Sequence, residues 1–250
     1  MKISPIWFFI HLFGLVLSIP VTLPGLEERE TSFNFLLTTI LDNLPQVDGT
    51  IEAVTGILTT FEQVIADVTG IPSTYNELGR LCTPYTVIFA RGTSEPGNVG
   101  LIVGPPFFEA LTSLVGSSAL TIQGVNNYAA SIAGYLEGGD PNGSAEMASQ
   151  IKSAVASCPD TKLIVSGYSQ GGQIVHNAIS QLPAATAQAI SSVVIFGDPD
   201  SGTPIPNVDA SKVLIICHPG DNICLNGDLI LVPHLTYASN ALQAANFVVE

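Results

Sequence analysis

The sequence contains few charged residues and very few basic ones. Charged residues make up 11% of the 250-residue chain, and seven Lys and Arg oppose 21 Asp and Glu, which gives a formal net charge of −14. A surface of this sign repels phosphate backbones and anionic lipid headgroups, so we expect no nucleic-acid partner. Hydrophobic residues reach 46%. That content excludes intrinsic disorder and is enough for one sizeable core.

Long hydrophobic runs are missing except at the start of the chain. Residues 1–18 contain Lys2 and then a nearly continuous apolar stretch, which is typical of a secretory signal peptide. The stretch is shorter than the ~20 residues that a membrane-spanning helix needs, and Pro20 follows it at once. We therefore expect secretion into the extracellular space and no integral membrane span. A sequon that begins at Asn142, in a Gly-rich segment expected to be a loop, is a candidate N-glycosylation site.

Cysteines at metal-binding spacing are also missing. The four cysteines are Cys82, Cys158, Cys217 and Cys224, and none belongs to a Cys-x-x-Cys pair. We therefore expect neither a metal nor a cofactor. In a secreted chain an even number of cysteines predicts disulfides, here two. The simplest pairing closes the short loop from Cys217 to Cys224 and leaves Cys82 to Cys158 as a long-range link.

Residues 19–73 form an acidic extension with a helical pattern. Apolar residues recur at three- and four-residue steps over 54–68, and a shorter run of the same kind covers 35–44. Each apolar stripe needs a covering surface. The extension is therefore ordinary scaffold, a lid over an apolar active site, or a pro-segment, and the pattern alone does not choose among them.

The remaining residues, 74–250, alternate short apolar segments with helical ones. We expect strands at 85–90, 120–124, 162–165, 192–196 and 212–216, and helices at 106–114, 144–157 and 173–182. This alternation is typical of an α/β domain whose parallel sheet is covered on both faces.

A strand, a Gly-x-Ser-x-Gly motif and a helix follow one another at residues 162–182. In this context Ser169 is the predicted nucleophile, placed on a tight turn with its hydroxyl exposed. Gly167 and Gly171 are needed because neighbouring backbone comes too close for a Cβ atom. The helix N-terminus after Ser169 favours a developing oxyanion, and the backbone N–H of Gln170 would be one donor.

A nucleophilic serine needs a histidine base and an acid that orients it, and in this motif's fold the chain order is serine, acid, histidine. His176 lies two turns into the following helix and points elsewhere. His234, near the C-terminus in an expected loop, is favoured over His218. For the acid, Asp198 and Asp221 both follow a strand and precede His234, so spacing alone leaves both open.

A second oxyanion donor usually comes from the loop after an early strand. In that loop, after residues 85–90, Thr93 offers a backbone N–H and a hydroxyl. The alternative is an ordinary polar loop in which Arg91 and Glu95 pair.

The sequence resembles the fungal cutinases over about residues 74–250. The matching motifs are Cys82 with Val87–Asn98 (VIFARGTSEPGN), Cys158-Pro159-Asp160-Thr161, Gly167-Tyr168-Ser169-Gln170-Gly171, Cys217 to Cys224 around Gly220-Asp221, and Pro233-His234-Leu235-Thr236-Tyr237. The resemblance implies a three-layer α/β/α sandwich with a central parallel five-stranded sheet, an α/β-hydrolase fold. It also implies Ser169, His234 and Asp221 as catalytic residues, Thr93 and Gln170 as oxyanion donors, and the two disulfides already favoured.

The same resemblance implies a serine esterase that acts on cutin, an insoluble polyester of hydroxy-fatty acids, and on short to medium acyl esters. We expect the secreted protein to be a monomer. The extension at 19–73 resembles the covering segment of a lidded subgroup. Two other functions fit the scaffold. One is an acetylxylan esterase of the same fold, and the other is a non-catalytic secreted surface-binding protein.

Overall fold

The computed structural model describes residues 32–42 and 49–250, so the predicted signal peptide at 1–18 lies outside the described residues. Its centre is a five-stranded parallel sheet in the order β3-β2-β4-β5-β6. The strands are β2 (Tyr85–Ala90), β3 (Leu120–Gly124), β4 (Lys162–Tyr168), β5 (Ser192–Phe196) and β6 (Val213–Ile216). All five lie where the sequence predicts strands, and β4 runs on into the Gly-x-Ser-x-Gly motif.

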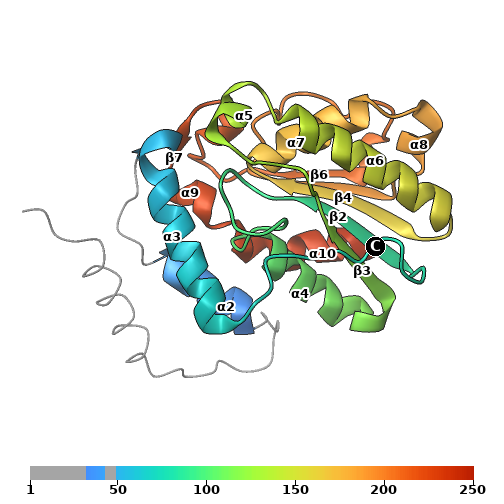
Figure 1. Cartoon of the computed structure of the whole chain (residues 1–250), viewed down its shortest axis with the longest axis horizontal. Helices are drawn as coiled ribbons and strands as arrows, with labels where there is room; N and C mark the ends of the chain where they lie inside the picture. The colour runs from blue at the N-terminus through green and yellow to red at the C-terminus, as the bar shows by residue number, and fades with distance from the viewer. Residues whose placement is uncertain (1–31, 43–48) are drawn as a thin grey trace, which may run out of the picture. The chain divides into compact units, whose positions relative to one another are not determined.

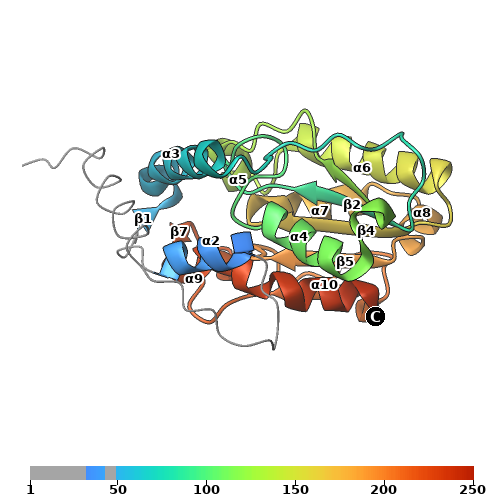
Figure 2. The ribbon, with the colours of Figure 1, turned by 90° about the horizontal axis from the view of Figure 1, so that it is seen from below.

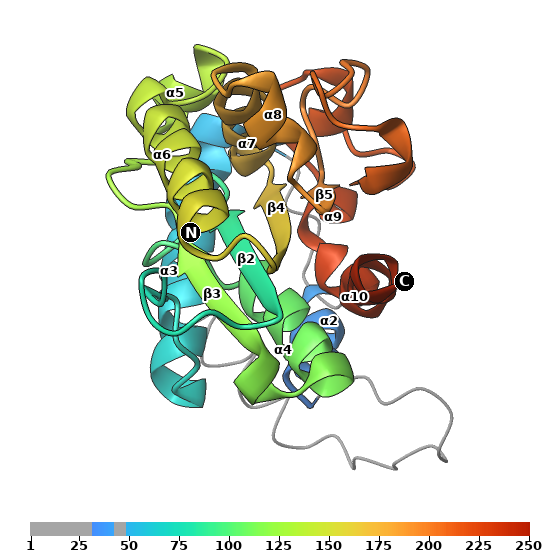
Figure 3. The same ribbon diagram turned by 90° about the vertical axis from the view of Figure 1, so that its right-hand side faces the viewer.

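Helices cover both faces of the sheet (Figures 1 and 3). On one face α6 (Pro141–Ser157) and α7 (Gln170–Ser180) pack together and against the central strands, and on the other α4 (Gly104–Val115) packs against α10 (Ala241–Val249). Shorter helical elements are α5 (Ile132–Leu136), α8 (Ala184–Gln188), α9 (Val232–Leu235), η1 (Ser117–Ala119), η2 (Ala210–Lys212), η3 (Ile223–Leu225) and η4 (Tyr237–Asn240). The predicted α/β/α sandwich is confirmed.

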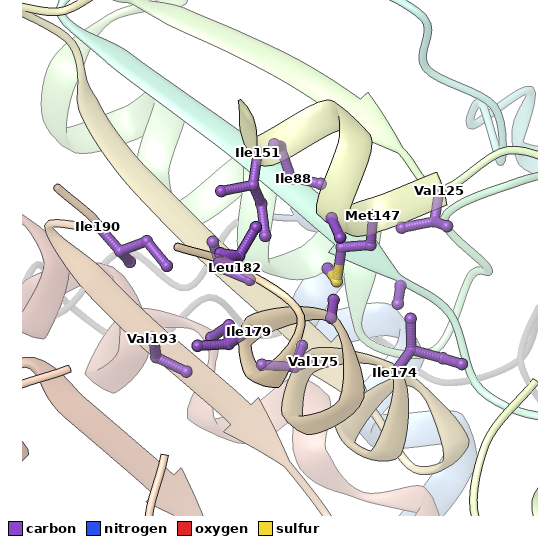
Figure 4. Packing of buried hydrophobic residues seen from close by; sticks show 14 of the residues in the cluster. Ile88, Val125, Met147, Ile151, Ile174, Val175, Ile179, Leu182, Ile190 and Val193 are labelled. Carbon is purple, nitrogen blue, oxygen red and sulfur yellow. The ribbon is translucent and has the colours of Figure 1, made fainter. Parts of the chain in front are cut away.

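The largest buried cluster lies between the sheet and the α6 and α7 layer. Figure 4 shows Met147 and Ile151 of α6, with Val175 and Ile179 of α7, facing strand residues such as Val193. Because both faces of the inner strands are covered, their sequences are nearly continuous apolar runs. The packed layers hold the carboxyl ends of β4 and β5 in fixed positions.

Helix α6 begins with a side-chain cap. The Asp140 carboxylate accepts the backbone N–H groups of Asn142 (2.8 Å) and Gly143 (3.0 Å), and Pro141 occupies the first turn. Asn142 of the sequon is exposed in this turn and does not lie in a loop as expected. The expectation was wrong because Asp-Pro at a helix start outweighs the loop preference of the Gly-rich segment.

We predict that Asp140→Ala lowers the free energy of unfolding by about 1 kcal/mol, since two N–H groups at the start of α6 lose their acceptor. Urea denaturation followed by circular dichroism measures this loss. Asp160→Ala, at an exposed turn, is the control and should change stability by less than about 0.5 kcal/mol. Equal losses in the two variants would contradict the assignment of the cap.

Two disulfides link distant and local parts of the chain, as predicted. Cys82–Cys158 joins the segment before β2 to the end of α6, with a sequence separation of 76 residues. Cys217–Cys224 closes a loop after β6, with a separation of 7 residues. Among the helices in the described ranges, none is long and apolar enough to cross a membrane.

Two helices of the acidic extension fall in the described ranges: α2 (Ser32–Asp42) and α3 (Ile51–Thr69). Helix α2 contacts α9 and η4 through a face that buries Leu37 (Figure 2). The start of α3 is fixed by a two-residue antiparallel pairing of β1 (Gly49–Thr50) with β7 (Leu229–Ile230). Its end is a left-handed cap at Gly70, where φ is 68°. These two helices therefore pack against the C-terminal part of the sandwich.

Candidate active site

Ser169 occupies a strained turn between β4 and α7. Its φ of 56° and ψ of −123° are unusual for a residue with a side chain. The turn is held by two backbone bonds, in which the Ser169 N–H donates to the Phe196 carbonyl (3.0 Å) and the Ser169 carbonyl accepts from the Gly172 N–H (2.8 Å). The chain therefore presents the Ser169 hydroxyl at the carboxyl edge of the sheet.

The two glycines of the motif have the steric role that the sequence predicts. A Cβ atom on Gly167 would lie 2.3 Å from the Gly171 carbonyl oxygen, and one on Gly171 would lie 2.0 Å from the Ala90 carbonyl oxygen. Both distances are far below contact distance, and both partners are backbone atoms that cannot rotate away. Only glycine fits at either position.

Ser169, His234 and Asp221 form a continuous chain of hydrogen bonds. The Ser169 Oγ lies 2.9 Å from Nε2 of His234, and Nδ1 of His234 lies 2.8 Å from Oδ2 of Asp221. A carboxylate can only accept, so Nδ1 carries the proton and Nε2 is free to accept from the serine hydroxyl. This is the arrangement of nucleophile, base and orienting acid that acyl transfer requires.

Asp221 is held inside the disulfide-closed loop. Its Oδ1 accepts the N–H of Ile223 (2.9 Å), and its Oδ2 accepts the hydroxyl of Tyr237 (2.6 Å) in addition to His234. Burial works against the charged form, but hydrogen bonds from His234, Tyr237 and Ile223 outweigh it and lower the pKa of Asp221 below its usual value. The carboxylate is therefore ionised at neutral pH.

The alternative candidates for acid and base lie elsewhere. Asp198 is buried against His176, with 3.0 Å between Oδ2 and Nε2, and caps its own turn by accepting the Asp200 N–H. His218 uses Nδ1 at the Pro233 carbonyl (2.9 Å) and Nε2 at Oδ1 of Asn240 (2.7 Å). The structure therefore brings Asp221 and His234 to Ser169, and leaves Asp198, His176 and His218 outside the chain of hydrogen bonds.

Two tyrosines that the sequence reasoning missed surround His234, which lies in the one-turn helix α9 and not in the expected loop. The Tyr168 ring stacks on the imidazole at a centroid distance of 5.1 Å, and its hydroxyl donates to the His234 carbonyl at 2.9 Å. Tyr237 meets the imidazole edge to face at 6.0 Å. Their signals were present but weak, since Tyr168 precedes the serine within its motif and Tyr237 lies three residues after His234.

Thr93 and Gln170 are joined beside Ser169. The Gln170 side-chain amide donates from Nε2 to Oγ1 of Thr93 (2.9 Å) and to the Ser131 carbonyl (2.8 Å). Because Oγ1 of Thr93 accepts in this bond, its own proton is available for another acceptor. Gln170 is the first residue of α7, and the first N–H groups of a helix have no acceptor within it. Backbone donors and a hydroxyl are therefore available next to the serine.

The loop that contains Thr93 is rigidly built. The Glu95 carboxylate accepts the backbone N–H groups of Gly92 (2.7 Å), Leu101 (3.0 Å) and Ile102 (3.0 Å). Arg91 donates from Nε to the Glu95 backbone carbonyl (2.8 Å), so the two residues interact but not through a paired carboxylate. The ordinary polar loop considered above is in fact folded around a buried glutamate.

A small cavity of ≈ 30 Å³ lies above the serine and is covered by α3. Its floor consists of Ser169, His234 and Thr93 together with the apolar side chains of Ile102, Ile230 and Leu235. Its roof is the inner face of α3, with Ile51, Thr55, Leu58 and Glu62. Ser169 is 3% exposed and His234 1% exposed. The cavity has room for about one or two water molecules and none for an acyl chain.

The chain has relatives of high sequence identity among known proteins. A model of the Cutinase family matches residues 81–250. The chain is 54% identical over 197 residues to a cutinase of Pyrenopeziza brassicae, which covers 79% of this chain and 96% of the relative. It is 50% identical over 218 residues to a cutinase of Hypocrea jecorina, which covers 87% of this chain and 86% of the relative.

Solved structures agree with the sequence relatives. The structure of Trichoderma reesei cutinase in complex with a C11Y4 phosphonate inhibitor aligns with a TM-score of 0.73 and 47% identity, and covers 87% of this chain and 97% of that one. An acetylxylan esterase structure aligns over 68% of this chain with a TM-score of 0.56 and 24% identity, a likeness of fold alone. With a family model over most of its length and relatives at half identity or more, this chain belongs to the cutinase family.

Proposed function

We propose that this protein is a secreted serine esterase that hydrolyses ester bonds of cutin and of short to medium acyl esters. Membership of the cutinase family supports carboxylic ester hydrolysis. The observation that carries the mechanism is the unbroken chain of hydrogen bonds from Ser169 through His234 to Asp221. The Trichoderma reesei relative is solved in complex with a phosphonate inhibitor, and an alkyl phosphonate is a suitable probe for the proposed nucleophile here.

In the proposed reaction the Ser169 Oγ attacks the ester carbonyl carbon while Nε2 of His234 takes the hydroxyl proton. Asp221 stabilises the imidazolium that forms. Backbone N–H groups of Gln170 and Thr93 donate to the oxyanion of the tetrahedral intermediate. Collapse of the intermediate expels the alcohol, which receives its proton from His234. Water, activated by the same histidine, then releases the acid from the acyl-enzyme.

We assign α3 the role of a lid, in preference to scaffold or pro-segment. Its inner face forms the roof of the cavity, and a side-chain bond from Oγ1 of Thr59 to the Ser94 carbonyl (3.1 Å) joins it to the Thr93 loop. The cavity cannot hold an ester while α3 is in place. Movement of α3 must therefore precede substrate binding, and an alignment over 218 residues with the Hypocrea jecorina cutinase extends the similarity into this segment.

The proposal also includes that the protein is secreted and acts as a monomer. The signal-peptide pattern at residues 1–18 and the two disulfides favour an oxidising, extracellular location. Asn142 is exposed at the start of α6 and accessible to a glycan.

The test is hydrolysis by the full secreted chain of p-nitrophenyl esters from acetate to palmitate, together with release of monomers from cutin. We expect rates that peak at short to medium acyl chains and measurable cutin hydrolysis. Activity confined to acetyl esters would point to the acetylxylan esterase alternative. A folded, disulfide-bonded protein that hydrolyses none of these substrates would refute the esterase proposal and favour a surface-binding role.

A further inference from the structure

The hydroxyl of Tyr237 lies at a junction between the orienting acid and the end of β6. It donates to Oδ2 of Asp221 at 2.6 Å and lies 2.9 Å from the backbone nitrogen of His218, whose N–H donates to it. Tyr237 is fully buried, three residues after His234 in the chain. One hydroxyl therefore connects Asp221 to a backbone group that the disulfide at Cys217 holds nearby.

The direction of the proton in these two bonds is fixed by chemistry. A backbone N–H can only donate, so the Tyr237 oxygen accepts from His218 and its single proton must go to Asp221. Burial, together with the hydrogen bond to Asp221, raises the pKa of Tyr237 far above its usual value. The hydroxyl therefore keeps its proton at neutral pH and donates it to Asp221.

The ring of Tyr237 has no freedom to turn away. The His218 ring stacks on it at a centroid distance of 4.1 Å, and Phe196 and Tyr168 contact it edge to face at 6.4 and 6.2 Å. Packing of this density holds a side chain in one rotamer. The hydroxyl therefore holds Oδ2 of Asp221 in a fixed position.

Oδ2 of Asp221 is also the oxygen that orients the base, because it accepts the Nδ1–H of His234. Apart from these two bonds, the carboxylate is held by the Ile223 N–H at Oδ1. Without the Tyr237 hydroxyl, Oδ2 would keep only the hydrogen bond from His234, and only the Ile223 bond at the other oxygen would resist tilting of the carboxylate.

We propose that Tyr237 is a positioning residue of this esterase: its hydroxyl fixes Oδ2 of Asp221 in line with Nδ1 of His234 and weakens the affinity of the Asp221–His234 pair for an extra proton. The inference rests on the proposed function, in which that pair activates Ser169. Hydrogen-bonded partners of this kind orient the group that reacts without touching the substrate.

The test is Tyr237→Phe, which removes the hydroxyl and keeps the ring. We expect kcat on p-nitrophenyl butyrate to fall about tenfold while KM changes by less than about twofold. The acid limb of the pH–rate profile should move up by about one pH unit, because an anion that loses a donor binds a proton more tightly, whichever atom of the pair takes it.

The other titratable groups near the pair stay in place in this variant. They are Tyr168 stacked on His234, His218 against the Tyr237 ring, Tyr135 beside the Asp221 loop, and Glu62 across the cavity. Their contributions are common to both proteins and cancel in the ratio of variant to wild-type rates. A shift of the acid limb in that ratio therefore reports on the lost hydroxyl.

The matched control is Tyr128→Phe, which removes another buried hydroxyl. Tyr128 donates to the neutral carbonyl of Arg91 at 3.1 Å and does not contact Asp221. Its loss should leave the acid limb in place. In the opposite sense, 2,3-difluorotyrosine at position 237 is a stronger donor and should move the limb to lower pH.

Titration of the His234 ring by NMR, measured alongside the rates, separates the two proposals. A folded Tyr237→Phe protein with unchanged His234 titration and an unmoved acid limb would overturn the role of Tyr237, even with a lower kcat. A wild-type protein without esterase activity would instead refute the proposed function, and the NMR titration would still decide on Tyr237. If Tyr237→Phe does not fold, the difluorotyrosine protein tests the proposal. A shift of its acid limb to lower pH supports the role of Tyr237, and a shift to higher pH or no shift overturns it.

Discussion

Ser169→Ala is expected to reduce kcat on p-nitrophenyl butyrate by at least about 10⁴-fold, since no acyl-enzyme can form without the Oγ atom. The fold should be unaffected. Alanine and serine both carry a Cβ atom, so the conformational strain at φ 56° is the same for either residue. The backbone hydrogen bonds to Phe196 and Gly172 do not involve the side chain. The residual rate would come from oxyanion donors that remain in place.

Covalent labelling gives this prediction a second readout. Wild-type protein treated with an alkyl phosphonate should gain one adduct by intact mass, and the Ser169→Ala protein none. Ser166→Ala is the matched control, because Ser166 is a buried serine of β4 whose Oγ has no hydrogen-bond partner. It should keep both activity and labelling. Persistent labelling of the Ser169→Ala protein would place the nucleophile elsewhere.

Glu62→Gln is expected to remove a rise of activity with pH that the proposed lid would produce in the wild-type protein. Glu62 is 3% exposed on the inner face of α3, in the roof of the cavity, and its Oε2 has no hydrogen-bond partner. Burial and the nearby Glu95 raise the pKa of Glu62 well above its usual value, although Arg91 opposes this. With α3 packed over the cavity, Glu62 is therefore held in its neutral form.

The groups that face Glu62 determine which carboxyl takes the proton. Glu95 is buried as well, and burial raises its pKa, but three backbone N–H groups and Arg91 stabilise its charge. Tyr168 and His234 are the remaining titratable groups at the cavity, and neither bonds to Glu62. Glu95 therefore keeps the charge and Glu62 takes the proton.

The sign of the pH effect follows from this difference. An open lid exposes Glu62 to water and returns its pKa to the ordinary value of a glutamate. The closed state is then most favourable below that value and loses stability as the pH rises, until the pH passes the raised pKa. Each unit between the two pKa values changes the ratio of open to closed molecules by about tenfold.

The measurement is the kcat/KM of Glu62→Gln divided by that of the wild type, taken from pH 4.5 to 9. Both proteins contain His234, so the effect of its protonation cancels in this ratio. Glutamine carries no charge, so its lid stays closed at all pH values, and the ratio should fall more than about tenfold by pH 8. Glu52→Gln, at an exposed position of the same helix, should give a flat ratio. A flat ratio for Glu62→Gln as well would contradict the role of Glu62.

Local patterns were sufficient for most of the sheet. The strands at 85–90, 120–124 and 192–196 have the predicted bounds because each is a short apolar run between turn residues. Strand β4 extends to Tyr168, beyond the strand end predicted at 165. Helix α7 starts at Gln170, as the Gly-x-Ser-x-Gly motif implied, and before the periodic pattern at 173–182. Serine and glycine dominate that stretch, and their low propensities are overridden by the tertiary packing of the turn.

Long-range geometry was not accessible from spacing. Asp198 and Asp221 each follow a strand, and only the path of the disulfide-closed loop brings Asp221 to His234. The apolar stripe of α3 predicted that something must cover it, but nothing in the periodicity says that the covered surface contains Ser169. The contributions of Tyr168 and Tyr237 depend on hydroxyl directions that no sequence pattern encodes.

The attachment of α3 has a kinetic consequence. The helix is joined to the sandwich at one end by the β1–β7 pairing and at the other by the Ser73 carbonyl, which accepts the N–H groups of Asn98 and Val99. As the proposed lid, a segment held in this way would act as an intramolecular competitive inhibitor whose effective concentration does not fall when the enzyme is diluted. Closure would raise the KM of every soluble ester by the same factor and leave kcat untouched.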